Sequence, residues 1–347
     1  MHEIQAQFVK TILAGAQDAP RERGTAFAPS NIALCKYWGK RDAVLNLPVN
    51  SSLSISLGHL GTRTGLRRSG EDRVFLNGKQ VAADGAFALR TLEFLDLFRP
   101  WFGNAAFEVR TQNNIPTAAG LASSASGFAA LVLALDDLAG WGLDKMRLSM
   151  LARLGSGSAA RSVFNGFVQW HAGSKPDGSD SFAEPVSKPW KELRIGILEL
   201  SNARKPVGSR DGMNRTVETS ELYKSWPQQA AADLETIHSA IDAQDFPTLG
   251  KTAERNALAM HATMLAAWPP LLYLQPETVG QIHKVQRARA DGLEVYLTID
   301  AGPNIKLLFL ERDESAVAAA FPGLQAIQPF GALPEAGGTA ASPPQEL

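Results

Sequence analysis

The spacing of hydrophobic and polar positions changes along residues 106–138, and this change predicts a strand, a loop and a helix in succession. Residues 106–112 alternate between apolar and polar side chains, which is the period of a strand with one buried face. Residues 128–138 instead repeat their apolar side chains at helical spacing. The intervening segment, 113–127, is rich in Gly, Ala and Ser, so it predicts a loop leading into the helix N-terminus.

The loop at 113–127 has the properties of a phosphate cradle. The first N–H groups of a helix lack intrahelical partners, and this end of the helix is partially positive. Small residues let the backbone approach an anion, and Ser123, Ser124 and Ser126 add hydroxyl donors. The alternative is a capped helix that packs closely on its neighbour through small residues. The loop alone favours neither interpretation.

The remaining first half of the chain gives further strand and helix patterns. Leu53, Ile55 and Leu57 alternate with serines, which predicts a half-buried strand. The Asn77-Gly78 pair after an apolar run predicts a hairpin turn. The other predicted elements are a short helix at 4–14, a strand at 32–35, helices at 86–98 and 143–154, and an exposed loop at 171–189.

Helical patterns dominate the second half. The predicted elements are strands at 193–200, 293–299 and 305–310, helices at 217–225, 230–244, 246–267 and 276–290, and a short helix at 314–321 before a last strand. Changes in composition divide the chain into an N-terminal extension (1–23), two domains (24–190 and 191–330) and a tail (331–347). We expect the tail to be disordered, because it is rich in Pro, Gly, Ala and Ser.

Composition and charge narrow the classes of function. The 347 residues carry a net charge of −1, which favours neither nucleic acid nor an acidic membrane surface as a partner. Cys35 is the single cysteine, so an internal disulfide and a cysteine-based zinc cluster are excluded, and its apolar flanks indicate packing. With no apolar run of membrane-spanning length and no signal-peptide pattern, we expect a cytoplasmic enzyme or binding protein.

Four separate stretches combine small residues with charges, around Lys36, Ser124, Arg161 and Asp300. An acid that accepts a hydroxyl proton, beside cations and a phosphate loop, suits phosphoryl transfer. Each charge also has a structural alternative. Lys36 and Lys40 fit a solvated surface pair, Arg161 fits the cap of a helix end, and Asp300 fits a turn.

Six blocks of the sequence, in the order in which they occur along the chain, resemble the diphosphomevalonate decarboxylase family of the GHMP kinase superfamily. The blocks are 28–33 with 36–40, 47–54, 114–125, 155–159 with 161–162, 209–213, and 300–304. The resemblance covers about residues 26–310. It implies an α+β GHMP kinase fold, with an N-terminal domain like domain 2 of ribosomal protein S5 and a ferredoxin-like C-terminal domain. ATP and substrate would meet in the cleft between them.

The family resemblance also implies an activity, with ATP as co-substrate and Mg²⁺ as cofactor. Such an enzyme phosphorylates the tertiary 3-hydroxyl of mevalonate 5-diphosphate, and loss of that phosphate and of CO₂ gives isopentenyl diphosphate in the mevalonate pathway of isoprenoid biosynthesis. We expect a cytoplasmic homodimer and assign no metal ligand. Alternatives are a decarboxylase of mevalonate 5-phosphate, a mevalonate 3-kinase-like enzyme, and a silent binding protein, which the retained charged residues disfavour.

The resemblance implies a role for individual residues. It gives catalytic roles to Asp300, Arg161, Lys36 and Asn31, ATP contacts to Ser123, Ser124, Gly120, Ala122 and Asn114, and substrate contacts to Tyr37, Lys40, Ser158, Arg161, Ser209, Arg210 and Met213. Asp300 is expected to accept or orient the proton of the 3-hydroxyl, with Lys36 close by. Arg161 is expected to hold the C1 carboxylate, and Asn31 to position that arginine.

Two departures from the family pattern concern the substrate's phosphate tail. Arg210 stands where some members carry Thr. The helix near Phe87 is expected to lack the arginine that eukaryotic members use for the diphosphate, with Arg210 as its replacement. These departures leave the length of the phosphate tail open.

Overall fold

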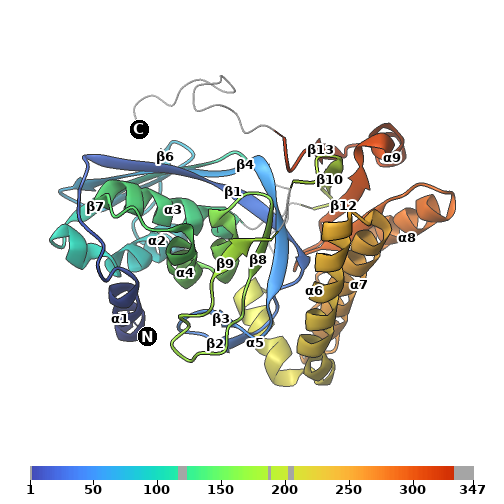
Figure 1. Cartoon of the computed structure of the whole chain (residues 1–347), viewed down its shortest axis with the longest axis horizontal. Coiled ribbons are helices and arrows are strands. Elements are labelled where there is room, and N and C mark those ends of the chain that lie inside the picture. Colours follow the sequence, from blue (N-terminus) through green and yellow to red (C-terminus); the bar gives the residue numbers. More distant parts are fainter. Residues whose placement is uncertain (1, 116–122, 187–188, 202–206, 332–347) are drawn as a thin grey trace.

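The structure is a computed structural model that describes residues 2–115, 123–186, 189–201 and 207–331. It is an α+β molecule in which two sheets lie beside each other with a layer of helices between them (Figure 1). The first half contains α1 (His2–Ile12), β1 (Arg23–Cys35), β2 (Lys40–Asp42), β3 (Leu47–Pro48), β4 (Ser52–Ser69), β5 (Arg73–Leu76), β6 (Lys79–Gln80), α2 (Ala86–Asp96), η1 (Arg99–Phe102), β7 (Ala106–Asn113), α3 (Ser123–Ala139), α4 (Lys145–Gly155), η2 (Gly157–Val163), β8 (Phe167–Trp170) and β9 (Ala183–Pro185).

The second half contains β10 (Leu193–Leu198), α5 (Ser209–Thr219), η3 (Glu221–Ser225), α6 (Trp226–Ala243), α7 (Phe246–Leu265), α8 (Pro276–Ala290), β11 (Tyr296–Ile299), β12 (Ile305–Leu310), η4 (Glu311–Asp313), α9 (Glu314–Ala320) and β13 (Gln325–Ile327). The bounds predicted for α8 and β12 are confirmed. The η elements are 3-10 helices.

The N-terminal sheet is built around β4. Its strand order is β6-β5-β7-β4-β8-β9, and β1 pairs with β4 outside this path. Helices α2, α3 and α4 pack on one face and form a hydrophobic core with it. The Asn77-Gly78 turn is confirmed, since it joins β5 to β6 with both residues at positive φ.

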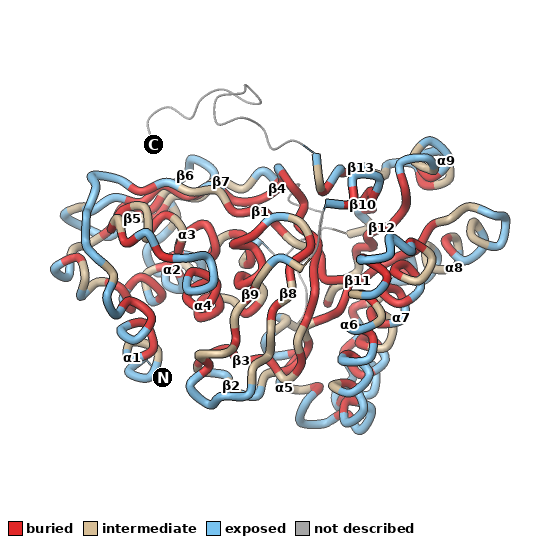
Figure 2. Tube along the Cα trace, in the orientation of Figure 1, coloured by how far each residue is buried: buried red, intermediate tan, exposed pale blue. Residues whose placement is uncertain are grey.

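The C-terminal sheet has the antiparallel order β11-β12-β10-β13. On one side, α8 and α9 contribute to a core with β11 and β12. On the other, α6 and α7 share a second core with this sheet and with apolar residues of β1 and β4. Figure 2 shows the result as buried stretches that run through β1, β4, α6 and α7. This shared core fixes the two sheets relative to each other.

Two predictions of exposure are wrong. The serines of β4 are not on a wet face: Ser52, Ser54 and Ser56 are all buried. Two of them are satisfied, because Ser52 accepts a hydrogen bond from Arg161 and Ser56 accepts one from a backbone N–H, whereas the Ser54 hydroxyl has no partner among the described residues. The segment 171–189 is not wholly exposed either, because it contains the strand β9 and is anchored on buried Arg153.

Two further elements differ from the sequence expectation. The helix expected at 217–225 begins earlier, as α5, and its last part is the 3-10 helix η3. Gly212 obscured the pattern, yet it suits this helix because a Cβ there would lie 2.6 Å from the Tyr273 hydroxyl. At the N-terminus, α1 packs into the first core through Phe8 and Val9, instead of standing apart as an appendage.

Candidate active site

A cavity of about 360 Å³ opens where β1, η2, α5 and the turn between β11 and β12 come together. It is lined by all four residues expected to be catalytic, Asn31, Lys36, Arg161 and Asp300. It is also lined by Ser124 and by the expected substrate contacts Tyr37, Lys40, Ser158, Ser209, Arg210 and Met213. Residues far apart in the sequence are thus gathered at one site.

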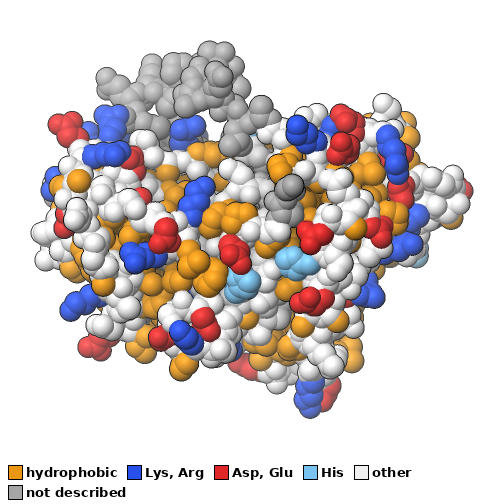
Figure 3. All heavy atoms as spheres, viewed as in Figure 1, with side chains coloured by type: hydrophobic (Ala, Val, Ile, Leu, Met, Phe, Trp, Pro, Cys, Tyr) orange, Lys and Arg blue, Asp and Glu red, His pale blue; other side chains and the backbone are white. Residues whose placement is uncertain are grey.

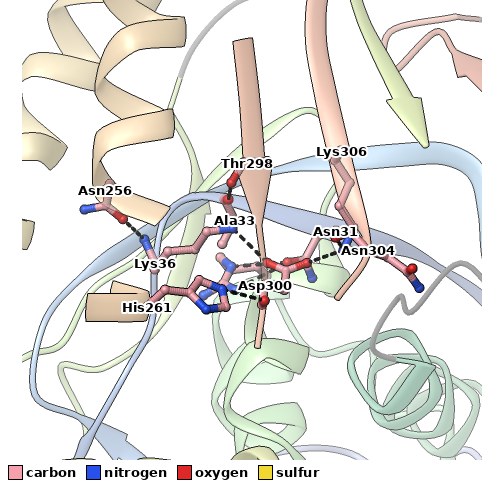
Figure 4. A network of polar contacts seen from close by, with 10 residues as sticks. Asn31, Ala33, Lys36, Asn256, His261, Thr298, Asp300, Asn304 and Lys306 are labelled. Carbon is pink, nitrogen blue, oxygen red and sulfur yellow. Dashed lines mark hydrogen bonds and ion pairs between the residues drawn. The ribbon is translucent and has the colours of Figure 1, made fainter. Parts of the chain in front are cut away.

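Asp300 is held by two buried lysines, Lys36 directly after β1 and Lys306 on β12 (Figure 4). Lys36 Nζ lies 2.8 Å from Oδ1, and Lys306 Nζ lies 3.0 Å from Oδ2. Burial alone would raise the pKa of this carboxyl, but Lys306 and Lys36 outweigh it and hold the pKa well below its usual range. The carboxylate is therefore ionised. Its side chain remains 32% exposed, so it is also accessible from the cavity.

The turn that carries Asp300 is fixed by side chains behind it. His261 of α7 lies with Nε2 3.1 Å from the Asp300 carbonyl, to which the neutral ring donates. Burial lowers the pKa of His261 to about 4, which keeps the ring neutral beside the two lysines. Asn304 accepts hydrogen bonds from the backbone N–H groups of Leu200 and Ser201, tying the turn to the end of β10.

Arg161 is buried on η2 and held by β1 and β4. Its Nη1 donates to Ser52 Oγ at 2.6 Å, and Nε and Nη2 each lie 3.4 Å from Asn31 Oδ1. Burial lowers the pKa of the guanidinium to about 10, so it stays charged at neutral pH. The helix-cap alternative is wrong, because the donors point to Asn31 and Ser52 and not to the end of α4. Lys36 is 2% exposed, so the surface-pair alternative is wrong for it.

A second group of cations, Lys40, Arg90 and Arg210, also lines the cavity. Burial, with Arg210 and Arg90 nearby, lowers the pKa of Lys40 to about 8. Arg90 belongs to α2, the helix near Phe87, so this helix supplies an arginine to the cavity beside Arg210. Its guanidinium donates to the Gly155 carbonyl at 2.9 Å.

Tyr37 contributes an unpaired polar group to the cavity. Its hydroxyl is buried and has no hydrogen-bond partner among the described residues, so a ligand could supply one. Burial raises the pKa of this hydroxyl well above its usual range, so it acts as a neutral donor or acceptor. Gly157 permits the approach of η2, since a Cβ there would lie 2.9 Å from the Tyr37 ring.

The expected ATP contacts are only partly placed at the cavity. Ser124 lines it and lies 3.4 Å, Oγ to Oγ, from Ser156. Ser123 begins α3 and is exposed. The Asn114 amide is used within the sheet, where it accepts from the Gly61 N–H and donates to the His59 carbonyl. Gly120 and Ala122 lie outside the described residues.

Sequence reasoning missed three groups that complete the site: Lys306, His261 and Ser52. Lys306 gave a usable signal, because it is the one charge in the apolar run Ile305–Leu310. His261 lies inside a long helix and Ser52 in an alternating strand, where neither spacing nor composition marks it. Their roles depend on contacts between distant elements.

The charges near Asp300 do not balance. The four groups are Lys36, Lys306, Arg161 and Asp300. Three cations against one carboxylate leave a surplus of two positive charges, so the site suits an anionic ligand. Over the face shown in Figure 3, by contrast, acidic and basic side chains are interspersed.

The described residues contain no group of three acidic, His or Cys side chains that could hold a metal. Mg²⁺ in nucleotide sites is commonly held by phosphate oxygens, water and one or two protein oxygens. The cavity fits that arrangement through Ser124, and it gives no reason to assign a protein carboxylate to the ion. Within the described part of the chain, no helix combines the length and apolar character that a membrane span needs.

The arrangement of the two sheets around one cavity is the GHMP kinase fold. Two family models match the chain, the diphosphomevalonate decarboxylase-like N-terminal domain over residues 28–183 and the mevalonate 5-diphosphate decarboxylase C-terminal domain over 195–329. The chain belongs to the diphosphomevalonate decarboxylase family.

Individual relatives are similar over most of their length. A diphosphomevalonate decarboxylase of Aspergillus fumigatus is 40% identical over 331 residues, which cover 88% of this chain and 81% of the relative. The mevalonate diphosphate decarboxylase structure from Enterococcus faecalis is 41% identical with a TM-score of 0.81, covering 88% and 95%. A structure described as MDDEF in complex with MVAPP, AMPPCP and magnesium is 42% identical with a TM-score of 0.82 and the same coverage.

Proposed function

We propose that the protein is an ATP-dependent decarboxylase that converts mevalonate 5-diphosphate to isopentenyl diphosphate, ADP, phosphate and CO₂. The observation that carries this proposal is the placement of Asp300 and Arg161 in one cavity. The carboxylate faces a hydroxyl that must be phosphorylated, and the guanidinium can receive the carboxylate that must be lost. A relative described in complex with MVAPP and AMPPCP supports both ligands.

The first half of the reaction transfers a phosphoryl group to a tertiary alcohol. Asp300 is ionised and clamped, so it accepts a hydrogen bond from the 3-hydroxyl and directs the oxygen toward the phosphorus. Its lowered pKa makes it a weak base. That suits a loose phosphoryl-transfer transition state, in which little charge on the attacking oxygen has to be relieved early. Lys36 supplies positive charge next to the reacting hydroxyl.

The second half expels phosphate and CO₂. Arg161 can bind a planar carboxylate through two parallel N–H groups, which fixes the angle of the C1–C2 bond to be broken. As CO₂ leaves, the electrons of that bond form the new double bond to C3, and the phosphate departs with the C3–O electrons. Positive charge that develops at C3 requires that no free nucleophile reach it.

The second group of cations supports a diphosphate, and not a monophosphate, as the phosphate tail of the substrate. Lys40, Arg90 and Arg210 give three positive charges on the cavity wall. A diphosphate carries more charge than a monophosphate and can span several donors, so this group favours mevalonate 5-diphosphate over the monophosphate. The unpaired Tyr37 hydroxyl offers a further donor to a phosphate oxygen.

ATP would be held at the N-terminus of α3, where Ser124 faces the cavity. Backbone N–H groups and the hydroxyl would bind the phosphates there. Mg²⁺ bound to those phosphates would neutralise charge during the transfer. The groups placed at the reacting atoms themselves are Asp300, Lys36 and Arg161.

The direct test is an assay of the purified protein with ATP and Mg²⁺ and, in separate reactions, mevalonate, mevalonate 5-phosphate and mevalonate 5-diphosphate. We expect equal amounts of ADP and CO₂ with the diphosphate only. ADP without CO₂ would instead indicate a 3-kinase. Preferential turnover of the monophosphate would indicate the alternative decarboxylase, and no turnover of any substrate would refute the proposal.

Three organisational features are also proposals. A cytoplasmic location is supported by the need for ATP. A homodimer is supported by the exposed apolar side chains Trp268 and Leu272, and light scattering on the purified protein measures it. The domain division at 190/191 is supported by family matches that end at residue 183 and begin again at 195.

A further inference from the structure

Lys306 lies at a position where a charge is costly. Every residue of β12 is buried, and Lys306 itself is 1% exposed. An ammonium group removed from water needs a partner to stay charged. The Lys306 Nζ has two, Asp300 Oδ2 at 3.0 Å and the Asn304 carbonyl at 3.4 Å.

Charge balance does not explain this lysine. Lys36 already pairs with Asp300 through Oδ1, and one ammonium neutralises one carboxylate. Adding Lys306 makes the buried cluster more positive than an ion pair would be. The cost must therefore be offset by something other than neutralising Asp300.

The geometry shows what the second lysine adds. Lys36 follows β1 and Lys306 is on β12, so the two ammonium groups grip different oxygens from different elements (Figure 4). Lys306 lies on an inner strand of the sheet. Its backbone is the register partner of Ile197 on β10 and of Thr298 on β11. A carboxylate held at one oxygen can rotate about its Cβ–Cγ bond, whereas one held at both cannot.

We propose that Lys306 is a positioning residue that locks the plane of the Asp300 carboxylate, so that its accessible edge points at the hydroxyl to be phosphorylated. This role rests on the proposed function, since it concerns the reacting hydroxyl of that substrate. Lys306 does not line the cavity and acts only through Asp300.

The charged and titratable groups facing Asp300 come from four elements. They are Lys36 after β1, Lys306 on β12, Arg161 on η2 and His261 on α7. Lys306 and Lys36 lower the pKa of Asp300 against the effect of burial. Removing Lys306 therefore raises that pKa, and the acid limb of the kcat profile moves to higher pH.

The test is Lys306→Met, which keeps an unbranched side chain one atom shorter than lysine and removes its charge. We expect kcat to fall by a factor on the order of 10², as for a misplaced reacting group. The KM for ATP should change less than about twofold, since ATP binds elsewhere in the cavity. The acid limb of the kcat profile should move to higher pH.

Arg194→Met is the matched control, because Arg194 is a buried cation of β10 whose ion pairs, with Glu311 and Glu314, are remote from the cavity. It should lower the melting temperature and leave the acid limb in place.

A second variant and a second measurement complete the design. Lys306→Arg keeps the charge but replaces the compact ammonium with a longer, planar guanidinium, so kcat should fall without a shift of the acid limb. This variant is decisive if the methionine variant does not fold. NMR titration of ¹³C-labelled aspartate, without substrate, reports the Asp300 pKa directly. A folded Lys306→Met enzyme with wild-type kcat and an unmoved Asp300 titration would overturn the proposal. Wild-type protein that releases no CO₂ would refute the proposed function, while the NMR titration would still decide whether Lys306 clamps Asp300.

Discussion

Asn31 Oδ1 lies 3.4 Å from both Nε and Nη2 of Arg161, so a single amide oxygen of β1 faces one edge of the guanidinium. The asparagine is itself oriented, because its Nδ2 donates to Ser162 Oγ at 2.8 Å and to the Ser158 carbonyl at 3.3 Å. This relationship fixes which edge of Arg161 remains for a ligand. It gives Asn31 a means of positioning Arg161 without contact with the reacting atoms.

Replacing Asn31 by Ala should therefore impair catalysis more than stability. Arg161 loses the acceptor on one edge but keeps Ser52 on the other. We expect kcat to fall by about 10- to 100-fold, as for other disturbed positioning contacts. The change in melting temperature should be a few degrees at most, because the residue is only partly buried. Steady-state kinetics and thermal denaturation of one preparation measure both. A large loss of stability with normal kcat would indicate a purely structural residue.

Asp300→Asn should abolish turnover while ATP still binds. The amide cannot accept a proton, and it forms much weaker contacts with Lys36 and Lys306 than the carboxylate does. Loss of a group that handles the substrate proton costs about 10² to 10⁴ in rate. Calorimetric titration with an ATP analogue and a CO₂ assay separate binding from chemistry. Near-normal kcat would remove Asp300 from the mechanism.

Sequence and structure agree on the charges that lie at or near the ends of regular elements. Lys36 follows β1, Asp300 follows β11, and Arg161 lies on the short 3-10 helix η2 after α4. Their blocks could be recognised, and the structure brings all three to the cavity. Lys306 was hidden inside a strand, and its meaning depends on Asp300 lying six residues earlier on the other side of a turn. Such a contact follows from the register of β11 on β12, which no local pattern contains.

The fold shows the same limit. The period-two pattern identified β4, but it could not show that the serine face would also be covered, because the covering groups come from η2 and the loop before β8. Likewise, Gly212 made α5 look like a loop until its contact with Tyr273 was known. Periodicity identifies an element, whereas the burial of its second face is a tertiary property.

Lys40 gives the site a pH dependence near neutrality. Burial and its arginine neighbours lower the pKa of Lys40 to about 8, so the ammonium form is lost as pH rises through this value. The KM for the diphosphate substrate should then increase above pH 8 by roughly three- to tenfold, for the loss of one contact. In Lys40→Met the KM should be high at every pH and should lack this inflection. An inflection retained in the variant would assign the titration to another group.

His261 should make stability depend on pH in a lower range. Its pKa in the folded state is depressed from 6.5 to about 4, so the unfolded state binds more protons between these values. Stability attributable to this histidine is therefore fully present above pH 6.5 and is lost as pH falls toward 4, by up to about 3 kcal/mol. Denaturant unfolding from pH 4 to 7 measures it. The His261→Gln variant should show a smaller slope, and an equal slope would contradict the assignment.

We propose that Asp300 and Arg161 serve successive halves of one reaction, and Arg161→Lys separates the two halves. Lysine keeps the charge but loses the two-pronged grip on the carboxylate. In a single turnover of mevalonate 5-diphosphate with ATP, both ADP and CO₂ are followed in time. We expect ADP to form at close to the wild-type rate, while CO₂ release slows by a factor on the order of 10². CO₂ that keeps pace with ADP, whether both are fast or both are slow, would contradict it.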